Sequence, residues 1–378
     1  MSTRLFTRPV LKEHGQWEDT WIRVWNSIIM IKVQHIVFNN SLDFKIQQGG
    51  IVEQGVEILY IYFADNCDSN SLCLVGRQLE WKPEIWIDLE KEKLQKVKEI
   101  NIVSLRGDLS KFSKHISNTF KNTEVKHHAF PLHMQKGLIT SVLETKSNLP
   151  VVENRTKSVY SSIGMMRLNR YILVKESIDK GYDNIFYPAI SQQQSRDYEY
   201  QIRQCNGVLS GPITLEAKRL FDKPMSLQEF NGKQIKHLSQ SYVNIVASFP
   251  NSNWIQYGNC EKFFNSIMCK TVPFMLCEKD SNTAGLQNLG FLPYVGFELA
   301  NDGIIDYVHR WQGLLHDNSH IFSDKTNAFE VYNKNLGIIK HNFDHLTKTD
   351  WASAKDQQFN NMPRAVQEYL SARPIWSN

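Results

Sequence analysis

An acidic and a basic residue stand side by side where a helix is expected to begin. Glu261 and Lys262 open the run 261–269, which follows the apolar stretch 242–249 and a polar loop. In the first turn of a helix, a carboxylate can accept hydrogen bonds from ribose hydroxyls, and an ammonium and unpaired backbone N–H groups can bind phosphate. Charged residues are also common at helix starts that carry no chemistry, so an ordinary surface role is the alternative.

Several short motifs with known mechanics are absent from the sequence. The chain has no G-x-x-x-x-G-K-[ST], no G-x-G-x-x-G, no H-E-x-x-H and no G-x-S-x-G. It also has no D-x-D, an acidic pair that can hold a divalent cation against phosphate oxygens. The six cysteines include no C-x-x-C pair, and no histidine cluster completes a zinc set. We therefore expect reduced cysteines and a site that works without a metal ion.

The sequence around the Glu-Lys pair predicts the elements that position it. After residue 150, the pattern predicts strands at 158–163, 184–187, 242–249 and 272–276, and helices at 168–180, 261–269, 283–289, 304–315, 328–346 and 363–372. Before residue 150, it predicts strands at 27–37, 56–63 and 101–105, and a surface helix at 88–99. Open α/β sheets bind ligands at the carboxyl ends of their strands, so the loop before Glu261 is a candidate site.

Length and charge limit the class of protein. The chain has 378 residues, of which 42% are hydrophobic and 22% are charged, and this suits two globular domains. Its 43 Lys and Arg residues against 39 Asp and Glu residues give a net charge of +4. That balance excludes a tight, charge-driven binder of nucleic acid. No apolar run reaches the roughly 20 residues of a membrane-spanning helix, and no secretory signal is visible, so we expect a cytoplasmic protein.

Four stretches of the chain together resemble the fucosyltransferase-like glycosyltransferases with the GT-B fold, and a set of viral and bacteriophage glycosyltransferase-like proteins. Residues 261–274 resemble the signature T-E-K-x-x-x-A-x-x-x-x-x-x-P, with Cys260 where the family has threonine. Residues 286–291 match L-x-x-L-G-F. Residues 160–170 resemble the first strand, loop and arginine of the family's donor domain, and residues 339–342 resemble a helix-borne H-N element.

The resemblance spans roughly residues 155–346 and implies a binding site for a nucleotide sugar. In the family, an arginine that opens the first donor-domain helix contacts the diphosphate, and the Glu-Lys pair contacts ribose and phosphate. By position, these residues become Arg170, with Arg167 as its rival, and Glu261 with Lys262. Arginine, lysine and helix N-termini can stabilise the departing diphosphate without a metal ion.

Aromatic and acidic residues complete the expected site. Trp254 and Tyr257 flank the donor loop and could stack on the nucleobase, with packing against the helix as the alternative. An inverting transfer needs a general base for the acceptor hydroxyl, and in the resembled enzymes that carboxylate comes from the N-terminal domain. Asp65 and Asp68, which follow the strand expected at 56–63, are the positional candidates. Their alternative role is to form a turn.

The resemblance implies an α/β fold of two Rossmann-like domains that face a cleft, the GT-B architecture. We expect residues 1–150 to form the acceptor-side domain and residues 151–346 to form the donor-binding domain. Residues 347–378 would form a C-terminal helix that returns across the domain junction. The polar, proline-containing stretch 146–156 marks the expected boundary.

The expected function is metal-independent transfer of a sugar from a UDP- or GDP-sugar to an acceptor hydroxyl, with no further cofactor. Similarity to phage proteins favours 5-hydroxymethylcytosine in double-stranded phage DNA as the acceptor, modified in the host cytoplasm. Such an enzyme would flip the base out of the duplex. The first alternative is the same reaction on a glycan, a lipid-linked sugar or a protein. The second alternative is a non-catalytic protein that keeps the fold and binds nucleic acid or another partner.

Overall fold

The chain folds into two compact units. The computed structural model describes residues 19–23, 30–39, 51–64, 83–105, 109–144, 155–161, 168–182, 185–186, 235–247, 261–276, 287, 289–299 and 307–372. Described residues up to Met134, together with those from Gln357 onward, form the first unit, and those of the stretch Gln135–Asp356 form the second. Among the described residues, no helix is long and apolar enough to cross a membrane.

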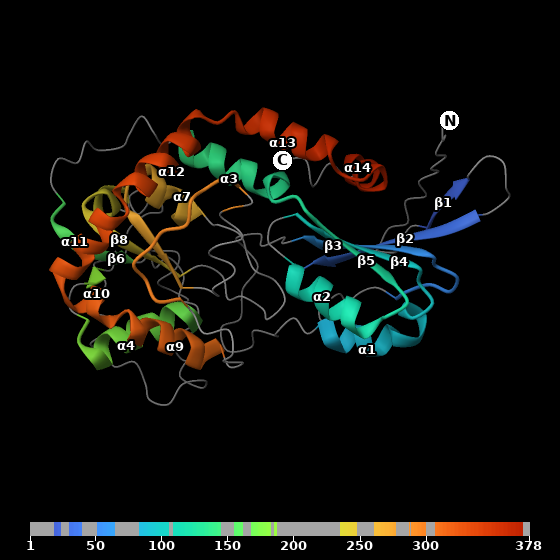
Figure 1. Cartoon of the computed structure of the whole chain (residues 1–378), viewed down its shortest axis with the longest axis horizontal. Helices are drawn as coiled ribbons and strands as arrows, with labels where there is room; N and C mark the ends of the chain where they lie inside the picture. Colours follow the sequence, from blue (N-terminus) through green and yellow to red (C-terminus); the bar gives the residue numbers. More distant parts are fainter. Residues whose placement is uncertain are drawn as a thin grey trace, which may run out of the picture. The chain divides into compact units, whose positions relative to one another are not determined.

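A five-stranded sheet forms the centre of the first unit (Figure 1). In spatial order its strands are β1 (Asp19–Arg23), β2 (Met30–Asn39), β3 (Ile58–Ala64), β4 (Glu99–Ser104) and β5 (Glu124–Ala129). β1 is antiparallel to β2, and the other pairs are parallel. Neighbouring residues Leu59, Tyr60, Ile61 and Tyr62 of β3 are all buried, which is typical of a parallel strand covered on both faces.

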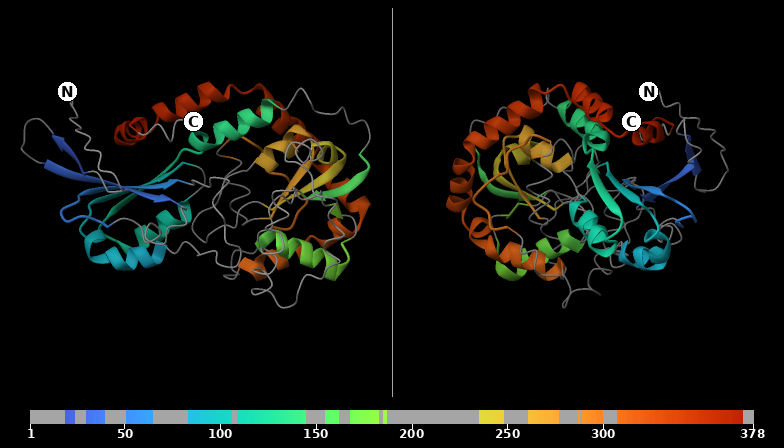
Figure 2. Two further views of the ribbon diagram at one scale, coloured as in Figure 1. Left: turned by 180° about the vertical axis from the view of Figure 1, so that it is seen from behind. Right: turned by 45° about the vertical axis from the view of Figure 1, so that its right-hand side comes forward.

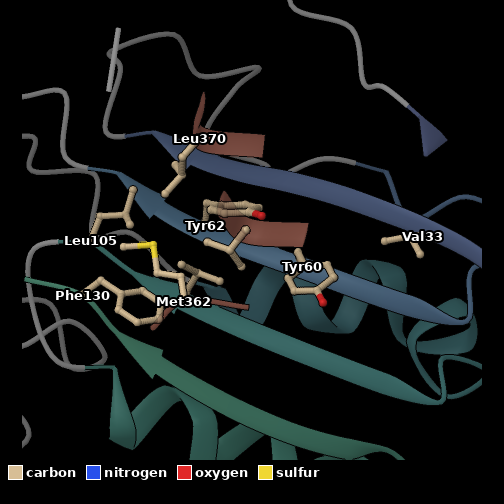
Figure 3. Close-up of a cluster of buried hydrophobic side chains, with 9 residues drawn as sticks. Val33, Tyr60, Tyr62, Leu105, Phe130, Met362 and Leu370 are labelled. Carbon is tan, nitrogen blue, oxygen red and sulfur yellow. The ribbon is translucent and has the colours of Figure 1, made fainter. Parts of the chain in front are cut away.

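Helices cover both faces of this sheet. The helices α1 (Pro83–Leu94) and α2 (Ser110–Thr119) lie on one face, and α14 (Arg364–Ser371) lies on the other (Figure 1). Val366 and Leu370, spaced four apart on α14, point to the sheet. They pack with Tyr60, Tyr62 and Val103 of the sheet in one buried cluster (Figure 3). The helix α14 is therefore part of the core of the first unit.

The second unit holds a four-stranded sheet in which every pair is parallel. In spatial order its strands are β7 (Ile185–Phe186), β6 (Lys157–Ser161), β8 (Ser241–Val246) and β9 (Val272–Met275). All four residues of β9 are buried, as are Val243, Ile245 and Val246 of β8. These continuous apolar runs are the ones that predict buried parallel strands in the sequence.

The helices of the second unit lie in two groups. The helix α4 (Leu168–Lys180) packs beside α9 (Tyr307–Asp317), and α7 (Glu261–Met268) packs beside α12 (Leu336–Lys348) (Figures 1 and 2). The remaining helices are α10 (Ser319–Ser323), α11 (Lys325–Lys334), α13 (Trp351–Asn360) and α3 (Leu132–Glu144), of which α3 begins in the first unit and α13 ends there. α11 contacts β6 and β8.

The mixed α/β class predicted from the sequence is confirmed, and α4 has the predicted bounds. The two-domain cleft and the domain boundaries stay predictions, since residues 145–154 lie outside the described part of the chain. The strands expected at 27–37, 56–63, 101–105, 158–163, 184–187, 242–249 and 272–276 correspond to β2, β3, β4, β6, β7, β8 and β9. The helix expected at 283–289 lies mostly outside the described residues.

Two expectations about helices are wrong. The helix expected at 88–99 is α1, which begins at Pro83, and its Leu89 is 67% exposed rather than buried. The single helix expected at 328–346 is interrupted at Asn335, whose side-chain amide bonds the backbone of Val295. α13 lies within the stretch 347–378 but is not predicted as a separate helix, because its sequence WASAKDQQFN has no apolar period and buries only Trp351.

Candidate functional site

The strand order of the second unit reverses between β6 and β8. From β6 the chain passes through α4 to β7 on one side, and β8 then pairs with β6 on the other side and is followed by α7 and β9. Right-handed crossovers in these two directions place α4 and α7 on opposite faces of the sheet. Ligands of open α/β sheets bind outside the carboxyl ends of the strands at such a reversal. The candidate site therefore lies beyond Ser161 and Val246.

Three predicted site residues lie at the starts of the helices that follow these strands. Arg170 is the third residue of α4, and Glu261 and Lys262 are the first two residues of α7. Both helices begin at the same edge of the sheet, because β6 and β8 are parallel neighbours. The backbone thus brings the starts of α4 and α7 to the reversal point. The positions predicted for Asp65, Asp68, Arg167, Trp254 and Tyr257 lie outside the described residues.

An apolar face holds α7 against the rest of the unit. Phe263, Phe264 and Ile267 are almost completely buried, whereas Lys262 is half-buried. The rings of Phe263 and Phe264 lie 6.0 Å and 6.1 Å from the ring of Phe291. With this face buried, the start of α7, whose first backbone N–H groups have no partner within the helix, follows the carboxyl end of β8.

A further basic residue, Arg155, lies at the opposite, amino-terminal end of the strands of the same sheet. Its guanidinium donates to the hydroxyl of Thr271 and to four backbone carbonyl oxygens, those of Ser239, Ser241, Cys269 and Lys270. It also lies 4.7 Å from the centroid of the Tyr332 ring. With its donors used by backbone acceptors at the amino ends of β8 and β9, Arg155 stabilises the fold and does not bind phosphate.

Residues 289–298, here called the pinned segment, form neither helix nor strand and are held by side chains at every third residue. His345 Nε2 donates to the Leu289 carbonyl at 2.8 Å. Three asparagines, all 0% exposed, then bond both the N–H and the C=O of one residue each: Asn342 bonds Leu292, Asn335 bonds Val295, and Asn318 bonds Glu298.

The pinned segment joins two of the stretches that carry the resemblance. Its residues Leu289, Gly290 and Phe291 form the L-G-F end of one motif, and α12 carries the His341-Asn342 pair of the other. Gly290 has a φ of +82°, and a Cβ there would lie 2.7 Å from His345 Nε2. The glycine is therefore required both by its backbone conformation and by the close approach of α12.

Sequence reasoning names Asn342 within the H-N element but does not single out Asn318 or Asn335. Asn335 and Asn342 lie within the helix expected at 328–346, whereas Asn318 follows the helix expected at 304–315. Nothing nearby in the sequence marks their backbone partners 20 to 50 residues away. A possible signal is their position, because two of them lie at helix boundaries, where asparagine is favoured. Their hydrogen bonds hold the pinned segment, which comes after β9 in the chain, in place.

A polar network crosses one face of the sheet in the first unit. Lys126 Nζ donates to Glu99 at 2.7 Å, Asn101 Nδ2 donates to Glu99 at 2.6 Å, and His128 Nε2 lies 2.8 Å from Asn101 Oδ1. Tyr60 pairs with Asn101 in the register of β3 and β4, so it lies beside this network. The members of the network satisfy one another.

Burial and neighbouring charges shift the pKa values of this network. Burial raises the pKa of Glu99, but hydrogen bonds from Lys126 and Asn101 outweigh it, so the pKa is lowered. Burial lowers the pKa of His128, and the nearby His127 and Lys126 lower it further. Burial also raises the pKa of Tyr60. The network therefore holds an ionised carboxylate beside a neutral histidine near neutral pH.

Metal-ligating side chains do not gather in the described part of the chain: no group of three or more His, Cys, Asp or Glu residues there is arranged to hold an ion. Cys269 is a buried free cysteine, as expected for a reduced protein. Burial raises the pKa of its thiol to about 12, so it is not a nucleophile at neutral pH.

Comparison with known proteins finds likeness at the level of structure. No protein-family model and no curated protein matches the chain. Among solved structures, the chain is similar to a sucrose-phosphate synthase from Thermosynechococcus elongatus, with 12% identity over 85% of this chain and 75% of that chain, and a TM-score of 0.39. It is also similar to a trehalose-6-phosphate synthase studied for glycosyl transfer with retention, with 12% identity over 80% and 69% of the two chains and a TM-score of 0.34. At these TM-scores, the likeness assigns neither the fold nor the activity of those enzymes to this chain.

Proposed function

We propose that this chain is a glycosyltransferase that moves a sugar from a nucleotide sugar to an acceptor hydroxyl without a metal ion. The observation that carries the proposal is the topology of the second unit. α4 and α7, which bear Arg170, Glu261 and Lys262 at their starts, follow the two strands that flank the reversal of strand order. Open α/β sheets bind nucleotides at this position, with phosphate at a helix N-terminus.

The residue types at these helix starts suit the loss of a nucleoside diphosphate. The reaction builds negative charge on the leaving phosphate oxygen. Arg170, or its rival Arg167, and Lys262 would stabilise that charge together with the backbone N–H groups of the first helical turns. Glu261 would accept hydrogen bonds from the ribose hydroxyls, and Trp254 or Tyr257 would stack on the base.

The acceptor side of the proposal rests on the first unit. Asp65 or Asp68, which follow β3 in the sequence, would remove the proton of the acceptor hydroxyl. The proposed acceptor is 5-hydroxymethylcytosine in double-stranded DNA, in line with the resemblance to phage proteins. A net charge of +4 suits transient contact with DNA through a local patch. A glycan, a lipid-linked sugar or a protein acceptor is the alternative.

Thermal unfolding with added nucleotides tests the donor site. UDP, GDP and their sugars, added in the presence of EDTA, should raise the melting temperature of the wild-type chain, because a ligand that binds only the folded state stabilises it. Arg170→Ala and Glu261→Ala should abolish the shift. Lys180→Ala, at the opposite and exposed end of α4, is the matched control and should keep it. No shift with any nucleotide would favour a non-catalytic binding protein.

Transfer of a labelled sugar tests the acceptor. Incorporation into DNA that contains 5-hydroxymethylcytosine, and not into unmodified DNA, is the expected result. Release of nucleoside diphosphate without incorporation into either DNA would keep the glycosyltransferase and replace its acceptor. Strict dependence on Mn²⁺ or Mg²⁺ would contradict the diphosphate site described above.

A further inference from the structure

One polar pair interrupts the apolar contact between α7 and β8. Asn244 lies in the middle of β8 and Ser266 lies on the buried face of α7, and both side chains are 0% exposed. Asn244 Nδ2 donates to Ser266 Oγ at 2.7 Å, and Ser266 Oγ donates to the carbonyl of Lys262 at 2.7 Å. The pair therefore links the strand, through two side chains, to the backbone of the first turn of α7.

This pair contributes something that the surrounding apolar contacts do not. Contacts of Phe263, Phe264 and Ile267 are non-directional, so they bury the face of α7 without fixing its position along its own axis. A hydrogen bond needs a set distance and direction, so it fixes the register of the helix against the strand. α7 has eight residues, and a small shift of the helix along its axis would displace its first turn by the same distance.

The Asn244–Ser266 pair also carries a free-energy penalty, which indicates a role other than stabilising the fold. Asn244 Oδ1 is buried and has no hydrogen-bond partner among the described residues. A buried unpaired acceptor is unfavourable, and two apolar side chains of the same size would fill the space without that penalty. Buried polar groups of this kind are best attested where they specify register rather than add stability.

We propose that Asn244 and Ser266 are positioning residues, which hold the first turn of α7 in register with the carboxyl end of β8. In that register Glu261 and Lys262 meet the ribose and the diphosphate of the nucleotide sugar. The inference rests on the proposed function, since it concerns how that donor site is held in place. Neither residue touches the donor, because both act through the backbone at Lys262.

Calorimetric titration with UDP and GDP tests the inference on the full chain. The double variant Asn244→Leu with Ser266→Ala removes both polar groups. We expect it to bind the nucleotide at least about tenfold more weakly than wild type, since small misplacements of binding groups are costly, while its far-UV circular dichroism and melting temperature stay close to wild type. Ser177→Ala is the matched control, because Ser177 is buried in α4 and makes the same bond, to the carbonyl of Leu173 at 2.6 Å.

Two further variants test the inference if the double variant does not fold. Ser266→Ala alone replaces serine by a better helix former and should still weaken binding. Ser266→Thr retains the hydroxyl and should bind as wild type does. Equal binding by wild type and Ser266→Ala would overturn the positioning role and leave the proposed function intact. Failure of the wild type to bind either nucleotide would overturn the proposed function and, with it, this inference.

Discussion

Gly290 shows how one position connects backbone conformation with packing. A side chain there would meet two obstacles, a φ of +82° and the His345 ring, whose Nε2 would be 2.7 Å from the new Cβ. We predict that Gly290→Ala destabilises the chain by about 1–3 kcal/mol, through backbone strain and loss of the His345 bond to Leu289. Urea unfolding measures the change.

Gly313→Ala is the control for that substitution. Gly313 lies within α9, and a Cβ there would have no atom within 4 Å. Replacing a helical glycine by alanine should be neutral or stabilise the chain by up to about 1 kcal/mol. Equal effects of the two substitutions would show that the close approach of His345 is not what requires glycine at position 290.

The lowered pKa of Glu99 predicts a dependence of stability on pH. A carboxyl whose pKa is lowered by folding binds fewer protons in the folded than in the unfolded state. Its stabilising contribution is therefore present above the ordinary glutamate pKa of about 4.3 and is lost as pH falls below it. We predict that Glu99→Gln destabilises the chain at pH 7 and that the difference from wild type shrinks toward pH 3.

Unfolding by urea at several pH values measures this difference. Glu92→Gln, at an exposed position of α1, is the control and should not change stability at either pH. A difference between wild type and Glu99→Gln that stays constant from pH 7 to pH 3 would contradict the role given to the Lys126 and Asn101 hydrogen bonds.

At the scale of elements, the pinned segment depends on side chains rather than on strand pairing. Asn342 supplies both bonding partners of the Leu292 backbone, at 2.8 Å and 2.9 Å. We predict that Asn342→Ala destabilises the chain by about 2–4 kcal/mol, because it leaves an N–H and a C=O unpaired. Amide hydrogen exchange should rise at Leu292 before it rises in β8.

Asn327→Ala is the control, because the Asn327 amide bonds the His320 carbonyl at an exposed position. It should change stability by less than about 0.5 kcal/mol. Unchanged exchange at Leu292 in Asn342→Ala would mean that the segment is held by its buried aromatic residues instead.

The sequence predicts the elements whose burial is periodic or continuous. α4 and the parallel strands β8 and β9 follow from their apolar patterns, since burial and sequence pattern have the same cause there. The break at Asn335 and the helix α13 do not follow, because long-range hydrogen bonds and a single buried tryptophan decide them. The helix starts that carry Arg170 and Glu261 can be predicted, but their meeting at one sheet edge needs the strand order.

At the scale of the whole molecule, the helix α14 folds with strands that lie far earlier in the sequence. Leu370 is 2% exposed and belongs to the cluster with Tyr62 and Val103, far earlier in the sequence (Figure 3). We predict that Leu370→Ala destabilises the first unit by about 2–4 kcal/mol through lost burial and the cavity left behind. Hydrogen exchange should increase in β3 and β4 and stay unchanged in β6 and β8.

Ser371→Ala, one residue further at an exposed position, is the control for that substitution. It should leave exchange in both sheets unchanged. An increase that appears in the second unit for Leu370→Ala would contradict the division of the chain into two units with the C-terminal residues in the first.

The central claim is a nucleotide site at the carboxyl edge of the second sheet. Titration of the isotope-labelled chain with UDP and GDP in EDTA, followed by two-dimensional ¹H–¹⁵N spectroscopy, tests it most directly. The account predicts that the amides of the first turns of α4 and α7, Leu168 to Arg170 and Glu261 to Phe263, shift at the lowest nucleotide concentrations. Shifts confined to the first unit, or none with either nucleotide, would contradict it.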